Sequence, residues 1–167
     1  MIFPSRLRWL ALTLLIVIAD RATKALIESR TTEGWTHELI HNFVYLVHSK
    51  NPGIAFSMFA NVHSHFLHFG LILLSIIFIA VLAWLLITSK SVTWRSLAGL
   101  ALLIGGAAGN LTDRLVHGAV TDFFEVWLGS YRYPAFNVAD SAITIGAVLV
   151  LLDVLFTPQK SVQSPKQ

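Results

Sequence analysis

Four long stretches dominated by apolar residues constrain this chain more than any other feature. They cover residues 8–27, 66–87, 96–114 and 137–156. A helix that crosses a bilayer needs about 20 predominantly apolar residues, and each stretch is close to that length. The composition agrees, because only 13% of the residues are charged, whereas a soluble domain has roughly 25%. We therefore predict a mainly α-helical membrane protein with four transmembrane helices.

The length suits a single membrane domain, which we place at residues 1–157. The polar residues 158–167 are expected to form a disordered tail. The first apolar stretch follows Arg6 and Arg8, as in a secretory signal peptide. It leads into Asp20, however, and not into a small-residue cleavage site, so we expect a retained helix.

The distribution of basic residues predicts the orientation of the helices. Four helices place both chain ends on one side of the membrane, together with the short connection at 88–95. That side holds basic residues outside the helices without acidic neighbours: Arg6, Arg8, Lys90, Arg95, Lys160 and Lys166. Since such residues concentrate on the cytoplasmic side, both termini are predicted to be cytoplasmic. The longer connections, 28–65 and 116–136, would then lie outside.

The first outer connection contains two segments rich in β-formers. Residues 43–47 and 54–59 are separated by residues 49–53, which include the turn signal Asn51-Pro52-Gly53. We predict a small β-hairpin lying on the outer surface of the membrane.

Several polar residues occur where a membrane helix should not tolerate them. Asp20 lies within the first stretch and must face the bundle interior or a wet cavity. Lys24, one turn later, could pair with it or extend to the interface. In the third stretch Gly105 and Gly109 have the GxxxG spacing that allows close helix approach. For Asp113 and Arg114, which follow, an ion pair that holds the helix end and a functional role both stay open.

Asp122 and Asp140 are the candidate catalytic pair. Asp122 alone could be a turn or cap residue of an outer loop, and Asp140 alone an N-terminal acid favoured by the helix dipole. However, Asp122 follows the outer end of the third predicted helix, and Asp140 lies at the outer end of the fourth. Both are therefore expected near the same membrane face, where they could meet. Two carboxylates in a poorly solvated site share one proton and titrate as a unit. Such a pair can hydrolyse an amide by general acid–base catalysis, so we predict a peptidase dyad.

Other chemistries find less support in the sequence. The chain has no cysteine, which excludes disulfides, thiolate metal sites and a cysteine nucleophile. His63, His65 and His68 form no HExxH motif, so we expect neither a metal nor a cofactor. The basic residues form no run that would indicate nucleic-acid binding.

Five segments, in order along the chain, carry a resemblance to a known family. They are residues 20–24, 51–56, 109–114, 120–123 and 136–141. With these segments the chain resembles the lipoprotein signal peptidase family, signal peptidase II, over about residues 9–156. In many relatives Arg21 is Gln and Pro52 is Thr; Pro52 would stiffen its loop.

The resemblance implies an aspartic endopeptidase of the bacterial inner membrane, with a periplasmic β-cradle and the active site near the periplasmic face. It implies removal of the signal peptide from prolipoproteins, with cleavage before the diacylglyceryl-modified cysteine. The expected partners are these substrates and membrane lipids, and the expected state is a monomer. Asp122 and Asp140 match the catalytic dyad of the family. The residues expected to bind substrate or support the site are Asp20, Asn51, Gly53, Asn110, Asp113, Arg114, Asn137 and Ala139.

The strongest alternative is a small proton-coupled membrane transporter or assembly factor, in which Asp20, Asp113 and Asp140 would relay protons. Such a relay predicts acidic residues at all membrane depths. Here only Asp153 is predicted to lie in the inner half, which favours an enzyme at the outer interface. A purely structural scaffold would leave Asp20 and Asp140 unexplained.

Overall fold

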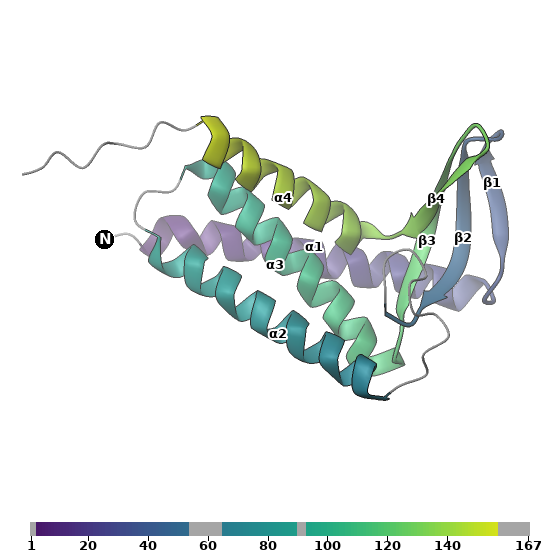
Figure 1. The fold of residues 1–167 in the computed structure, drawn as a ribbon, viewed down its shortest axis with the longest axis horizontal. Coiled ribbons are helices and arrows are strands. Elements are labelled where there is room, and N and C mark those ends of the chain that lie inside the picture. Colours follow the sequence, from purple (N-terminus) through teal and green to yellow (C-terminus); the bar gives the residue numbers. More distant parts are fainter. Residues whose placement is uncertain (1–2, 54–64, 90–92, 157–167) are drawn as a thin grey trace, which may run out of the picture.

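The computed structural model describes residues 3–53, 65–89 and 93–156. The described residues form four helices and four strands. The helices run lengthwise, and the β-sheet lies across one end of them (Figure 1). The elements follow in the order α1 (Phe3–Arg30), β1 (Thr36–Ile40), β2 (Val44–Asn51), α2 (His65–Thr88), α3 (Trp94–His117), β3 (Val120–Leu128), β4 (Tyr131–Phe136) and α4 (Val138–Phe156). Each predicted apolar stretch is therefore a helix. By length and composition, α2 and α4 are candidate membrane spans, at Phe66–Thr88 and Val138–Phe156.

Helix α3 lies in the middle of the bundle and packs against the other three helices. Its glycines allow this, as the small-residue pattern predicted. A Cβ on Gly99 would lie 2.7 Å from the carbonyl oxygen of Gly146 in α4, and one on Gly105 would lie 2.9 Å from Ile16 Cβ in α1. On its other side, α3 forms an apolar core with α2 around Leu82, Leu86, Leu100, Leu103 and Ile104.

The outer faces of the helices carry large exposed apolar side chains. On α1 they include Leu10, Leu14, Leu15 and Ile18, and on α4 they include Ile145, Val148, Leu151 and Leu155. Helix α2 exposes such residues along most of its length. A helix bundle in water would not present apolar side chains all round, so this surface is suited to contact with lipid.

The sheet is antiparallel with strand order β1-β2-β3-β4, which differs from the predicted hairpin. Strand β2 pairs with the preceding strand β1, and Asn42, with φ 53°, lies in the connection between them. β2 continues through Asn51, so the predicted turn is wrong at residues 49–51. The strand predicted at 54–59 lies outside the described residues. The turn signal was misleading because Ser49, Lys50 and Asn51 pair with β3, and such pairing overrides local propensity.

Strands β3 and β4 were not predicted at all. Residues 116–136 were expected to be a connection, with Asp122 in a loop. Asp122 lies instead within β3, opposite Ser49 of β2. The sheet therefore joins two outer connections that are distant in sequence, and it carries one of the two candidate aspartates.

Candidate active site

Asp122 and Asp140 reach one pocket from different elements, the first from β3 and the second from the first turn of α4. The pocket has a volume of about 270 Å³. It is lined by Asn51, Asn110, Arg114, Val120, Asp122, Tyr133, Pro134, Ala135, Phe136 and Asp140. The structure thus brings together five of the polar residues that the sequence singled out. A sixth, Asn137, is buried and hydrogen-bonded to both Asp122 and Asp140.

Asn137 links the two aspartates. It precedes α4, and its Oδ1 accepts a hydrogen bond from the Asp140 N–H at 2.9 Å. The Asp140 Oδ2 accepts in turn from the Asn137 N–H at 3.3 Å, which completes the reciprocal arrangement of a capping box. Asn137 Nδ2 also donates to Asp122 Oδ1 at 2.7 Å. One side chain therefore caps the helix that carries Asp140 and orients the carboxylate of Asp122.

Two further asparagines complete the contacts of the carboxylates. Asn51 Nδ2 donates to Asp122 Oδ2 at 3.2 Å, and Asn110 Nδ2 donates to Asp140 Oδ1 at 2.8 Å. Asn51 is oriented by Gly53, whose N–H donates to Asn51 Oδ1 at 3.1 Å. Gly53 has a φ of 156°, and a Cβ there would lie 2.4 Å from Leu71 Cδ1. A side chain at this position would be strained and crowded, which explains why glycine fits.

The surroundings of Asp122 favour its protonated form. Its side chain is 3% exposed. Burial, together with the nearby negative charge of Asp140, raises the pKa of Asp122 to about 7 against the opposing hydrogen bonds from Asn51 and Asn137. The pair can therefore retain a proton near neutral pH, which acid–base hydrolysis by two carboxyl groups requires.

Arg114 faces the pocket instead of pairing with its neighbour Asp113. Its Nη1 donates to the backbone oxygen of Asn110 at 3.3 Å, while its buried Nε has no hydrogen-bond partner among the described residues. Asp113 and Arg114 therefore do not form the ion pair that the sequence left open for the end of α3. Asp113 is fully buried and pairs with Lys24 at 2.8 Å and with Arg21.

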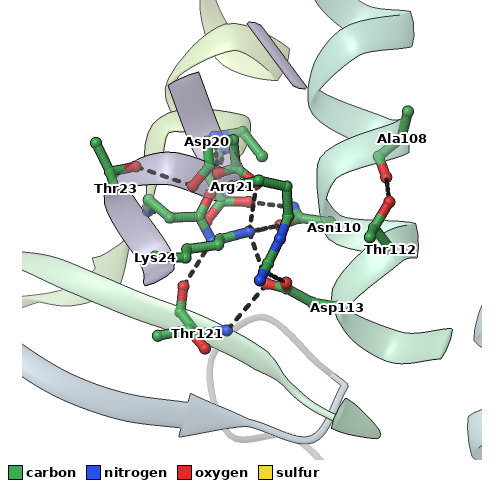
Figure 2. Close-up of polar contacts among 12 residues, drawn as sticks. Asp20, Arg21, Thr23, Lys24, Ala108, Asn110, Thr112, Asp113 and Thr121 are labelled. Atoms are coloured by element: carbon green, nitrogen blue, oxygen red, sulfur yellow. Dashed lines mark hydrogen bonds and ion pairs between the residues drawn. The ribbon is translucent and has the colours of Figure 1, made fainter. Parts of the chain in front are cut away.

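Lys24 is the residue that sequence reasoning undervalued (Figure 2). From the sequence alone, Lys24 could either extend to the membrane interface or pair with Asp20. In the structure it is fully buried and pairs with Asp20 Oδ2 at 2.7 Å. The i,i+4 spacing from Asp20 was the available signal. Its second carboxylate partner, Asp113, could not be inferred, because that contact depends on how α1 packs against α3.

The remaining predicted residues fall into two groups. Ala139 is buried, and its N–H donates to Asp20 Oδ1 at 2.9 Å, so both residues support the start of α4. His63 lies outside the described residues, as does the side chain of His65. Within the described part of the chain, no group of three or more His, Cys, Asp or Glu residues could hold a metal ion.

Comparison with known proteins places this geometry in context. Residues 12–156 match the family model described as signal peptidase (SPase) II. The chain is 40% identical over 154 residues to the lipoprotein signal peptidase of Solibacter usitatus, covering 89% of this chain and 92% of that one. It is 38% identical over 164 residues to that of Vibrio cholerae serotype O1, covering 96% and 93%.

A solved structure has the same fold. It is described as a bacterial membrane enzyme at 2.3 Å resolution, and it superposes with a TM-score of 0.81 at 27% sequence identity. The match covers 99% of this chain and 95% of the other. The likeness therefore includes the sheet as well as the four helices.

Proposed function

This chain belongs to the signal peptidase II family, and we propose that it is an aspartic endopeptidase that removes the signal peptide from lipid-modified prolipoproteins. The relatives named above are lipoprotein signal peptidases, which supports prolipoproteins as the substrates. The aspartic mechanism rests on one observation, the presence of Asp122 and Asp140 in a single pocket. From the family resemblance we propose that the cleaved bond lies before a diacylglyceryl-modified cysteine.

In the proposed reaction the two carboxyl groups share one proton. The ionised carboxylate accepts a proton from a water molecule, whose oxygen attacks the scissile carbonyl carbon. The neutral carboxyl donates its proton to the carbonyl oxygen, giving a tetrahedral diol. The proton taken from water then passes to the leaving nitrogen as the C–N bond breaks. One diol hydroxyl gives its proton to the second carboxylate as the carbonyl re-forms, so the pair again holds one proton. Neither a metal nor a covalent intermediate is needed.

The polar residues around the dyad have distinct proposed roles. Asn51, Asn110 and Asn137 hold the carboxylates by the hydrogen bonds described above. Arg114 lines the pocket with a guanidinium that retains unused donors, so it is suited to bind a substrate carbonyl. Gly53 and Ala139 support the site through backbone N–H groups.

We further propose that all four helices cross the bacterial inner membrane as one domain over residues 1–157. Exposed apolar side chains on α1, α2 and α4 support this arrangement. The start of α1, the end of α2, the start of α3 and the end of α4 lie at one end of the bundle, away from the sheet (Figure 1). Together with the basic residues of the tails, this supports our proposal that the termini are cytoplasmic and that the sheet and dyad lie near the periplasmic face. We propose that the enzyme acts as a monomer in contact with membrane lipids.

The transporter alternative is not favoured by the arrangement of the acids. Asp20, Asp113, Asp122 and Asp140 gather where the helices meet the sheet. Asp153 alone of the aspartates lies at the other end, where it accepts hydrogen bonds from Thr93 and Ser96 at the start of α3. A proton path would need groups between these two ends.

The direct test is incubation of the purified protein with two versions of one prolipoprotein, with and without the diacylglyceryl group on its cysteine. We expect release of the signal peptide from the lipidated version alone. Mass spectrometry of the product should place the new N-terminus at the modified cysteine. Cleavage of neither version, or equal cleavage of both, would contradict the proposal.

A further inference from the structure

Lys24 is a fully buried cation that the proposed reaction does not use. Its ammonium group contacts Asp20 Oδ2 at 2.7 Å, Asp113 Oδ2 at 2.8 Å and Asn110 Oδ1 at 3.1 Å. Taking an ammonium group out of water costs several kcal/mol unless its partners compensate. Within the cluster of Figure 2, two cations, Lys24 and Arg21, balance two carboxylates. A buried ion cluster is weak evidence for a role in stability, because apolar residues of similar volume often stabilise a core as well.

Both carboxylate partners of Lys24 hold backbone next to a proposed catalytic aspartate. Asp20 Oδ1 accepts from the N–H of Ala139 at 2.9 Å, the residue that precedes Asp140. Asp113 Oδ2 accepts from the N–H of Thr121 at 3.3 Å, the residue that precedes Asp122. One cation thus anchors two acids, and each acid fixes the backbone that carries one member of the dyad.

The third partner of Lys24 acts on the dyad directly. Asn110 Oδ1 accepts from Lys24 and also from Asn137 Nδ2 at 3.3 Å. Its Nδ2 is thereby directed at Asp140 Oδ1, at 2.8 Å. With its amide reversed, Asn110 would point an NH₂ group at the ammonium and an oxygen at the carboxylate, which neither partner can satisfy.

We infer that Lys24 is a positioning residue for both aspartates, acting through Asp20, Asp113 and Asn110 without touching the substrate. The inference rests on the proposed function. Lys24 differs from a residue that only stabilises the fold. Each of its three partners makes one further hydrogen bond, either to a dyad aspartate or to the residue that precedes one.

The test is Lys24→Gln, which keeps a polar side chain but removes the charge. Cleavage of a prolipoprotein with a diacylglyceryl-modified cysteine is measured per folded molecule. We expect kcat to fall by about 100-fold, the size of effect that a misplaced catalytic group produces, while KM stays close to the wild-type value. The charged groups around Asp122 are Asp140, Arg114 and Lys24, and the charge of Lys24 lowers the pKa of Asp122. The acid limb of the pH profile of kcat should therefore move to higher pH in the variant.

Two further variants keep the inference falsifiable. If Lys24→Gln folds poorly, Lys24→Gln with Asp113→Asn restores the charge balance of the cluster. It should fold while kcat stays low, because the contacts to Asp20 and Asn110 are still lost. Asp153→Asn is the matched control: it changes a buried carboxylate, 7% exposed, at the other end of the bundle and should keep the wild-type kcat and pH profile.

The outcomes distinguish failure of the positioning role of Lys24 from failure of the proposed peptidase function. An unchanged kcat and pH profile in folded Lys24 variants, beside an active wild type, would overturn the positioning role alone. A lower yield of folded protein with normal kcat would overturn it too, since that is the effect of a purely stabilising residue. A wild type that fails to cleave the lipidated prolipoprotein would overturn the proposed function, and the inference with it.

Discussion

Asp122 and Asp140 are held in different ways, although both are candidate catalytic groups. The oxygens of Asp122 accept from two side-chain amides, those of Asn51 and Asn137. Asp140 accepts from the side chain of Asn110 and from the backbone N–H of Asn137. Asp122 is therefore held from β2 and from the start of α4, and Asp140 from α3 and from the start of α4.

The dyad predicts a specific pattern of mutant activity. Asp122→Asn and Asp140→Asn keep the shape of the side chain but cannot exchange a proton, so each should abolish turnover. Because the two act as a unit, the double variant should be scarcely worse than either single one. Initial rates on a lipidated prolipoprotein, normalised to folded enzyme, measure this. Substantial activity in either single variant would mean that the pair is wrongly assigned.

The raised pKa of Asp122 also predicts how stability depends on pH. The pKa is 3.8 in an unfolded chain and about 7 in the folded protein. Between these values the folded state binds more protons than the unfolded state, so the contribution of Asp122 to stability falls as pH rises through this window. Asp122→Asn removes that contribution and should show a smaller loss of Tm between pH 5 and pH 8 than the wild type. Thermal unfolding in detergent measures the difference, and an unchanged loss of Tm would contradict the prediction.

At the scale of the elements, the helices were predictable, whereas only one strand of the sheet was: the segment predicted at residues 43–47 corresponds to the first part of β2. An apolar stretch of membrane length indicates a helix without reference to the rest of the chain. The strands take their place from pairing between segments that are far apart, such as Asn51 with Val120. No local pattern around Asp122 contains that information, which is why it was expected in a loop.

The same reasoning explains which site residues the sequence could provide. Asp140 is conspicuous because an acid near the end of a membrane helix needs a reason, and Asp122 because it lies in the connection that leads to the same helix. The asparagines were identified through the family resemblance. Their hydrogen-bond partners depend on the packing of α1, α3 and α4 and were not predictable. The importance of Lys24 emerged only when its three partners were seen together.

The contact between α3 and α4 offers a test that leaves the dyad chemically intact. A Cβ on Gly106 would lie 2.4 Å from the carbonyl oxygen of Ala139, which is backbone and cannot move without shifting Asp140. Gly106→Ala should therefore lower both Tm and kcat. Gly70→Ala in α2 is the control, because a Cβ there meets nothing within 4 Å, and loss of the flexible glycine should be neutral or stabilise by up to about 1 kcal/mol.

If Gly106→Ala retained full activity and stability, α4 would not be fixed by this contact. If Gly70→Ala lost activity to the same extent, the loss in Gly106→Ala would be a general result of placing alanine in a helix and not of the contact with Ala139. The comparison of the two variants isolates the close approach of α3 to the start of α4.

On the scale of the whole molecule, polar and apolar features separate along the bundle. The sheet lies at one end of the bundle (Figure 1), and both the Lys24 cluster and the dyad are attached to it, through Thr121 and Asp122 of β3. Exposed apolar side chains cover the helices between the two ends. A substrate that is itself anchored in the membrane by an apolar segment and acyl chains could reach such a pocket from the side, without leaving the bilayer. The fold is therefore suited to hydrolysis at the membrane interface.

This arrangement predicts the orientation of the protein, which single cysteines can test because the chain contains none of its own. Ser130, between β3 and β4, is exposed at the sheet end, and Ser89 follows α2 at the opposite end. In intact spheroplasts an impermeant maleimide should label Ser130→Cys, whereas Ser89→Cys should be labelled only after the membrane is opened. Both variants should retain cleavage activity, which shows that the labelled protein is folded. The reverse labelling would place the dyad on the cytoplasmic face, where a prolipoprotein presents its positively charged leading segment and not its cleavage site.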